Sequence, residues 1–559
     1  MASKLNKRSI GPVIGIIVIV LINVVLSGKF FRVDLTEEKR YTLAPVTKSF
    51  LSNLETDVFI RVYLDGELNP GFRKLARSSH ETLEEFRIIS RGRIKYEFID
   101  PTDNSEIVEE LKELGVSPVP VFEVTADGRR IQSNVYPFAH FRVGEYEMVV
   151  NLLENVPGLN ATANLNLSME GLEYKISSSI RNMLTDEVQA VAFLEGHGEL
   201  EEIDVYDISE ELSHYYQVDR GSLTSDPYIL DAYKVLIIAK PREKFSERDK
   251  FILDQYVMRG GKVLWLVDAV YITLDSLKGT SQTPGVASEL GIEDLLFRYG
   301  VRINMELLQD VQSSLIPVNV APQGEQARMV PMPWMFNPLM STNTSHPVTR
   351  GVNLVKGEFV SSIDTVGTFG LMRRDILLQT GQYSRRLPVP VYVSIAMVNE
   401  QPNREEFNQS YIPTAVAMEG VFPSLFANRP VPPGVDINLS DIKRESVATR
   451  MIVVADGDVI RNDVRMRYSA SPQIVPLGYD EVSSQNFGNK DFILNAVHYL
   501  ADDEGWMSLR TRDYRIRLLD REKLAHDLDF WKWINLAVPP LFLLLIGAGF
   551  VIWRRYKYR

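Results

Sequence analysis

Two apolar segments, one near each end of the chain, limit the folds open to this sequence more than any other feature. The first covers residues 10–28, and the second covers residues 531–553 with Lys532 as its one charged residue. A helix rises about 1.5 Å per residue, so segments of this length can cross a hydrocarbon core about 30 Å thick. We therefore predict one transmembrane helix in each segment.

The first segment has an alternative interpretation as a cleaved signal peptide, because Lys4, Lys7 and Arg8 form a basic region before it. Its apolar run is long for a signal peptide and its cleavage site is poor, so we favour a retained anchor. The second segment has a tryptophan at each end and is followed by RRYKYR, a pattern typical of a membrane interface.

Basic residues flank both segments on their terminal sides. By the positive-inside rule, residues 1–9 and 554–559 are expected in the cytoplasm, and the region between the segments in the periplasm of a bacterial inner-membrane protein. That region holds all 73 acidic residues but only 53 of the 61 Lys and Arg residues. Such an excess of negative charge disfavours nucleic acid as a partner.

The chain contains no cysteine. Disulfides, thiolate metal sites and cysteine nucleophiles are therefore excluded together, and this composition fits a bacterial periplasm better than a eukaryotic lumen.

Residues 29–155 predict a small α/β domain, broadly like thioredoxin. Apolar runs predict strands, helical periodicity predicts two helices between them, and Asp127-Gly128 is typical of a tight hairpin turn. The expected strands are 58–63, 94–99, 119–124 and 147–153, and the expected helices are 72–89 and 106–114. Residues 156–168, rich in Asn and containing Pro-Gly, are interpreted as a linker.

Residues 169–505 predict a doubly wound α/β domain, because short apolar runs alternate with helical patterns. The expected strands are 188–194, 235–239, 263–268 and 451–455, and the expected helices are 169–184, 202–216, 246–259 and 488–505. Ser246 with Asp249 three residues later is typical of a helix start. In the last helix, Ile493, Ala496, Val497 and Leu500 are expected to form the inward stripe. A β-rich insertion is expected at about 316–447, with strands at 376–380 and 389–398 among others. Residues 506–530 carry alternating charges and predict a connector helix.

The best single candidate for a functional site is the turn Glu195-Gly-His197-Gly-Glu199, which follows a predicted strand. Ligands of open α/β sheets bind at the carboxyl ends of strands, and His197 could act there as a base oriented by Glu195 or Glu199. The structural interpretation is a tight turn made by two glycines before an acidic helix start. We favour the structural interpretation, because no second catalytic group is identifiable.

Asp268 and Asp456 each follow a predicted parallel strand, so they could meet at the same edge of the sheet and contact a ligand. Acids at strand ends are frequent in this architecture, and we therefore expect no metal. The sequence has no HExxH, Walker A, GxGxxG or GxSxG motif. We expect no catalytic residue and no cofactor.

Four segments in this order carry a family resemblance: FLEGHGEL, RDKFILDQYVMRGGKVLWLVD, FRYGVRINMELLQD and NKDFILNAVHYLADDEG. Together with FRVDLTEEKRYTLAPVTKSFL they resemble the auxiliary proteins found beside bacterial ABC transporters, and within these the GldG family of gliding-motility proteins of Bacteroidetes. The resemblance covers nearly the whole chain. It implies a glutamine-amidotransferase-like second domain that lacks its nucleophile, and two partners: an ABC permease subunit and a separate ATPase subunit, like GldF and GldA.

The expected function is that of a non-catalytic accessory or substrate-recognition subunit in an ABC-type membrane complex associated with gliding motility and secretion. Two alternatives stay open at this point. One is a membrane-anchored periplasmic hydrolase or amidotransferase-like enzyme that uses the Gly-His-Gly-Glu turn. The other is a structural linker to the cell envelope, against which the strong negative charge argues.

Overall fold

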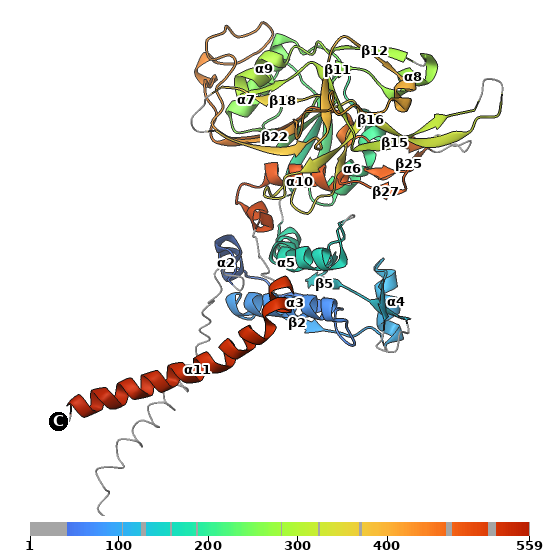
Figure 1. Cartoon of the computed structure of the whole chain (residues 1–559). Coiled ribbons are helices and arrows are strands. Elements are labelled where there is room, and N and C mark those ends of the chain that lie inside the picture. The colour runs from blue at the N-terminus through green and yellow to red at the C-terminus, as the bar shows by residue number, and fades with distance from the viewer. Residues whose placement is uncertain are drawn as a thin grey trace, which may run out of the picture. The chain divides into compact units, whose positions relative to one another are not determined.

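The computed structural model describes residues 42–102, 104–124, 130–156, 159–185, 188–280, 282–321, 325–367, 372–465, 472–511 and 521–557. The chain divides into two compact units, Tyr41–Arg512 and the remainder at the two ends, which are described separately (Figure 1). The predicted membrane segment at residues 10–28 lies outside the described residues and stays a prediction.

The first part of Tyr41–Arg512 is built on a four-stranded sheet with the order β2-β1-β5-β6. β1 (Val58–Val62) and β2 (Ile94–Phe98) are parallel, whereas β5 (Phe138–Val143) and β6 (Tyr146–Asn151) add in antiparallel fashion. Strand β5 was missed in the sequence. The other elements here are α2 (Pro45–Ser52), α3 (Pro70–Ile89), α4 (Ser105–Glu113), β3 (Val119–Val124), β4 (Arg130–Val135) and α5 (Ala161–Leu184).

The predicted linker at 156–168 is wrong over its second half. Helix α5 begins at Ala161, because the side chain of Asn160 accepts a hydrogen bond from the backbone N–H of Ala163 and caps the helix. Its apolar residues Leu172, Ile176 and Ile180 are buried in the same core as β1 and α3. The helix therefore completes the first domain and does not open the second.

The second part is built on a ten-stranded sheet whose main order is β15-β16-β19-β22-β23-β10-β9-β7-β8. The five strands β7 (Ala190–Glu195), β8 (Gln217–Ser222), β9 (Val235–Ala239), β10 (Lys262–Leu266) and β23 (Thr449–Val454) are parallel to one another. In chain order these strands run 2-1-3-4-5, so the direction of winding reverses between β7 and β9. In such sheets ligands bind at the carboxyl ends of the strands, next to that reversal.

Helices cover both faces of the parallel strands. α6 (Tyr206–Ser213), which follows the 3₁₀ turn η1 (Glu202–Val205), and α10 (Asn489–Ala501) pack on one face. α7 (Glu247–Met258) and α9 (Glu293–Tyr299) pack on the other. Alternate strand residues face opposite ways, so a strand buried on both sides must be apolar throughout. This explains the uninterrupted apolar run of β9.

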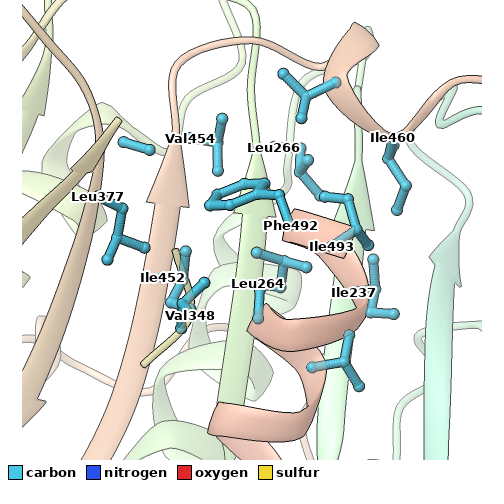
Figure 2. Close-up of a cluster of buried hydrophobic side chains, with 14 of the residues drawn as sticks. Ile237, Leu264, Leu266, Val348, Leu377, Ile452, Val454, Ile460, Phe492 and Ile493 are labelled. Carbon is cyan, nitrogen blue, oxygen red and sulfur yellow. The ribbon is translucent and has the colours of Figure 1, made fainter. Parts of the chain in front are cut away.

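The predicted inward stripe of α10 is confirmed. Ile493, Ala496, Val497 and Leu500 are each fully buried. Figure 2 shows Phe492 and Ile493 of this helix directed at strand residues that include Leu264 and Leu266 of β10 and Ile452 and Val454 of β23.

The predicted insertion at 316–447 differs from the structure in extent and in kind. The departure from α/β order begins directly after β10. Its strands β19 (Arg373–Gln379) and β22 (Pro413–Gly420) continue the main sheet in antiparallel fashion beside β23, and β16 (Met329–Thr342) and β15 (Ser313–Asn319) follow them toward the edge. The remaining elements of this region are β11 (Val270–Tyr271), α8 (Leu274–Thr280), β12 (Gln282–Ala287), β13 (Val301–Ile303), β14 (Glu306–Asp310), β17 (Val355–Lys356), β18 (Ile363–Thr365), β20 (Ser384–Pro388), β21 (Val391–Ser394), η2 (Ile395–Asn399) and η3 (Leu439–Asp441). After β23 follow η4 (Asp458–Ile460), β24 (Val464–Arg465), β25 (Gln473–Ile474), β26 (Tyr479–Asp480) and β27 (Gln485–Asn486).

The predicted connector helix at 506–530 is also different. Residues Trp506–Thr511 form a 3₁₀ turn, η5, whose Trp506 ring is buried and packs edge-on against Phe50 at a centroid distance of 5.4 Å. Because the Trp506 ring buries a large apolar surface against Phe50, this segment packs on the first domain and does not extend into solvent. Helix α11 runs without a break from Arg521 to Lys557. It covers the second part of the predicted connector, the whole predicted membrane segment and the first residues of the predicted tail.

Within α11, residues Phe530–Lys557 are long and apolar enough to cross a membrane, with a mean hydropathy of 2.3 over their most apolar window. This is the one such helix among the described residues. The mixed α/β class is confirmed, whereas the specific likenesses to thioredoxin and to glutamine amidotransferases stay predictions.

We predict that Phe492→Ala lowers the free energy of unfolding by about 3–5 kcal/mol, because the ring fills the space between α10 and the sheet and its removal leaves a cavity. Phe492→Leu, which keeps much of the volume, should cost less than about 1.5 kcal/mol. Urea denaturation of the full-length protein in mild detergent, followed by tryptophan fluorescence, measures both. Equal losses for the two variants would contradict the packing described here.

Candidate functional site at the carboxyl edge of the sheet

The Gly-His-Gly-Glu turn leaves β7 at the point where the winding of the sheet reverses. Gly196 and Gly198 have φ angles of +110° and +71°, which residues with a Cβ rarely adopt. The carbonyl oxygen of His197 accepts hydrogen bonds from the backbone N–H groups of Arg242 and Glu243, each at 2.8 Å. The turn after β7 is therefore tied to the turn after β9, across the reversal.

The imidazole of His197 is buried and occupied on both nitrogens. Nδ1 lies 3.2 Å from the carboxylate of Glu199, and Nε2 lies 3.4 Å from the carboxylate of Asp249. One face of the ring stacks on Phe245, with centroids 3.8 Å apart and planes inclined by 8°. His197 therefore links the turn after β7 to Phe245 in the loop after β9 and to Asp249 at the start of α7.

Charge explains the state of this histidine. Burial alone would lower its pKa, but hydrogen bonds and electrostatic attraction from Glu199 and then from Asp249 prevail and raise the pKa above its usual value. Asp249 has a lowered pKa despite burial, because Ser246, Arg248 and His197 donate to it. The turn therefore favours an imidazolium ion between two carboxylates.

Glu195 has a different position. It is exposed, and its carboxylate accepts a hydrogen bond from Arg220 on β8 at 2.7 Å. The structure thus brings His197 together with Glu199 and Asp249, whereas Glu195 is exposed and pairs with Arg220.

A second group of charges gathers where β9, β10 and β23 end side by side. Asp268 and Asp456, predicted to meet at this edge, lie together with Asp458, and one carboxylate oxygen from each of the three lies within 4.8 Å of the others. We call the whole set the carboxyl-edge cluster. It consists of Lys240, Asp268, Glu358, Asp456, Asp458 and Arg461.

Lys240 is the central cation of the carboxyl-edge cluster. Its side chain is 3% exposed, and its ammonium group lies 3.1 Å from Asp268 and forms a second ion pair with Asp458. Its backbone φ of +55° is unusual for a residue with a long side chain. Such a conformation costs about 1–3 kcal/mol, so the surrounding contacts must hold the lysine in place.

Backbone donors complete the cluster. The N–H of Gly457 donates to Asp268 at 2.6 Å, and the N–H groups of Asp458 and Glu358 donate to the two oxygens of Asp456 at 2.7 and 2.8 Å. A Cβ on Gly457 would lie only 2.5 Å from the Cβ of Lys240. Glycine at this position therefore lets β9 and β23 bring their end groups into contact.

The pKa values of the cluster follow from crowding in a buried place. Burial, and then repulsion from Asp458, raise the pKa of Asp456 well above its usual range and that of Glu358 to about 7. Burial raises the pKa of Asp268 as well, and Lys240 opposes this shift. The pKa of Lys240 is raised, because attraction from Asp268 and Asp458 outweighs its burial. The ammonium group of Lys240 thus lies beside two of the three clustered carboxylates, Asp268 and Asp458.

A cleft opens beside the cluster. It has a volume of about 290 Å³ and lies between the loops after β9 and β10 and the strands β11 and β12. Lys240 and Asp268 form part of its wall, Arg242 and Glu289 stand at its rim, and its other side is largely apolar.

A comparison with known protein families identifies the class of protein that this site belongs to. A family model described as an ABC-type uncharacterized transport system matches residues 189–496, which is more than half of the chain. The chain belongs to this family. The matched segment of this transport-system protein begins one residue before β7 and ends within α10, so it contains the turn, the cluster and the cleft.

A second model, described as a domain of unknown function (DUF7088), matches residues 37–142 of the first domain. No curated protein gives a significant match. Among solved structures, one titled "mmIFT52 N-terminal domain" is 11% identical, with 56% of this chain and 99% of that chain covered and a TM-score of 0.31. A likeness at that level carries no inference for this transport-system protein.

Sequence reasoning found two members of the carboxyl-edge cluster and missed the other four. Lys240 and Asp458 had usable signals, since one directly follows the apolar run of β9 and the other lies two residues after Asp456. Glu358 and Arg461 had none, because Glu358 comes from the middle of the insertion and Arg461 from a loop. Asp249, the second carboxylate on His197, was read only as a helix-start residue.

We predict that His197→Gln destabilises the protein most between about pH 4 and 6.5 and progressively less above that range. The histidine pKa is raised by folding, so its contribution is complete below the unfolded pKa of about 6.5 and is lost as pH rises through the higher folded value. Thermal denaturation of both proteins across pH measures this difference. A difference that grows with pH would contradict the imidazolium assignment.

We predict that Lys240→Met lowers the free energy of unfolding by about 3–5 kcal/mol, because Asp268 and Asp458 lose their shared cation in a buried place. Arg242→Met is a matched control two residues away, since Arg242 is exposed and no ion pair holds it among the described residues; it should change the free energy by less than about 0.5 kcal/mol. Adding Asp458→Asn to Lys240→Met should recover part of the loss. Urea denaturation checks all three.

Proposed function

We propose that this protein is a non-catalytic accessory or substrate-recognition subunit of an ABC-type membrane complex, working with a polytopic permease subunit and a separate ATPase subunit. The observation that carries the proposal is the family match over residues 189–496, since the family is described as a transport system. ATP hydrolysis would belong to the other subunit.

The geometry of the candidate site supports a non-catalytic role. A general base needs a free nitrogen or oxygen within reach of a substrate, whereas both nitrogens of His197 face carboxylates and its ring is stacked. Ser246, the nearest hydroxyl in this network, donates to Asp249 at 2.6 Å and caps α7. These contacts are what a structural joint requires.

The family and α11 support a membrane setting. The helix from Phe530 to Lys557 is suited to anchor the chain in the membrane that holds the transporter. We propose the bacterial inner membrane, with residues 41–512 in the periplasm and the basic end of α11 in the cytoplasm. The resemblance to GldG motivates the finer proposal that the partners are GldF-like and GldA-like and that the complex serves gliding motility and secretion.

We predict that the tagged full-length protein, extracted from its native membrane in mild detergent, copurifies with a polytopic permease and a P-loop ATPase identified by mass spectrometry. The control carries the same tag on a chain in which residues 530–557 are replaced by an unrelated single membrane span. If α11 contacts the permease, this control recovers less of it at equal expression.

Absence of both partners, in an extract where the permease is shown to be soluble and intact, would overturn the accessory proposal. Equal recovery by the control would keep the complex but move the contact from α11 to residues 41–512. A hydrolytic activity that His197→Gln abolishes without unfolding the protein would contradict the non-catalytic role.

A further inference from the structure

The cleft beside the carboxyl-edge cluster has features of a small-molecule binding site. Small-molecule sites are concave, largely apolar, and carry a few polar groups that fix orientation, and they lie at the carboxyl ends of strands in sheets of this kind. The cleft lies at the carboxyl ends of β9 and β10 and joins an apolar wall to a polar one, and its volume of about 290 Å³ suits a molecule of amino-acid size.

One wall of the cleft is apolar and partly exposed. Val270 and Ile272 are buried at its base, whereas Tyr271 and Val286, which pair across β11 and β12, are 58% and 42% exposed. Removing such apolar surface from water is favourable. A ligand with an apolar body would therefore gain from lying against this wall.

The other wall ends at Asp268. This carboxylate is the acid of the cluster that lines the cleft, and its side chain is 14% exposed, against 3% for Lys240 and 6% for Asp458. One oxygen accepts from Gly457 and the other faces Lys240 at 3.1 Å. A carboxylate has about four acceptor positions, so Asp268 keeps capacity for a donor that arrives from the cleft.

The acceptor position left on Asp268 decides which ligand group suits the inner end of the cleft. Of the four carboxyl groups in the carboxyl-edge cluster, Asp456 and Glu358 have raised pKa values, so Asp268 and Asp458 are the principal anions that face Lys240 and Arg461. At the rim, Arg242 and Glu289 offset one another in charge. An ammonium group at the inner end of the cleft could donate to the acceptor position left on Asp268, whereas a carboxylate there would place acceptor against acceptor.

We propose that the cleft binds a small organic ammonium ion with an apolar body, such as a free amine or the first residue of a peptide, with its ammonium group on Asp268 and its apolar part against Val286 and Tyr271. The inference rests on the proposed substrate-recognition role. It assigns that role to a defined place and a chemical class.

The test uses the purified full-length protein in detergent, without any partner, so that its outcome is independent of the copurification experiment. Isothermal titration compares leucinamide, which has an ammonium group, with N-acetyl-leucinamide, which is neutral, and with N-acetyl-leucine, which is an anion. A charge-assisted hydrogen bond predicts that leucinamide binds at least about tenfold more tightly than either. The tripeptide Leu-Gly-Gly, titrated in parallel, distinguishes a peptide end from a free amine as the favoured source.

Two variants locate the site. Asp268→Asn should weaken leucinamide binding at least about tenfold by removing the charge. Val286→Arg places a cation in the cleft from an exposed position and should abolish binding even if Asp268→Asn proves unstable. Val311→Arg is the matched control, because Val311 is 41% exposed and does not line the cleft, and it should bind normally.

Failure of leucinamide to bind, tighter binding of N-acetyl-leucine, or unchanged binding by Val286→Arg would each overturn the proposal. Tighter binding of the anion would assign the site to Arg242 and a carboxylate ligand instead. None of these results would affect the proposed association with a permease and an ATPase.

Discussion

The ammonium group of Lys240 holds together the ends of three neighbouring strands. It follows β9 directly and pairs with Asp268 beyond β10 and with Asp458 beyond β23. Without this shared cation, three carboxylates would converge in a buried place where their repulsion is poorly screened. The left-handed backbone at Lys240 and the close approach of Gly457 both follow from the need to bring this one amine to that position. The neighbouring cleft takes its inner wall from the same groups.

The long excursion between β10 and β23 has a physical logic of its own. An antiparallel strand can add beside β23 because its backbone groups are otherwise unpaired at that edge, and β22 takes this place along six residue pairs. The excursion thus protects the edge of the parallel sheet while it delivers Glu358 to the cluster. It also supplies β11 and β12, which face the candidate ligand cleft. A single insertion therefore contributes both to the stability of the sheet and to the shape of the site.

The sequence predicted those parts of the fold that are set by local pattern. Strands β9 and β23 and the inward face of α10 were predicted because buried parallel strands and amphipathic helices have clear periodicities. Strand β5 and the start of α5 were missed, since Asn and Ala residues in the second case look like a linker until Asn160 is seen to cap a helix. At the site, Asp268 and Asp456 were predicted from their place after strands. Glu358 and Arg461 could not be predicted from the sequence, because they reach the site through tertiary contacts that leave no local pattern.

The unbroken length of α11 has a mechanical consequence. Its 37 residues correspond to roughly 55 Å of helix, nearly twice the thickness of a hydrocarbon core of about 30 Å. A helix of that length that spans the membrane is longer than the hydrocarbon core, so part of the same continuous helix must lie outside the core. The residues that weaken it as a helix, Pro539-Pro540 and the glycines Gly547 and Gly549, lie within the apolar segment itself. Any bend would therefore arise at membrane depth, and the outer part of the helix would swing as a lever about a pivot set in the lipid.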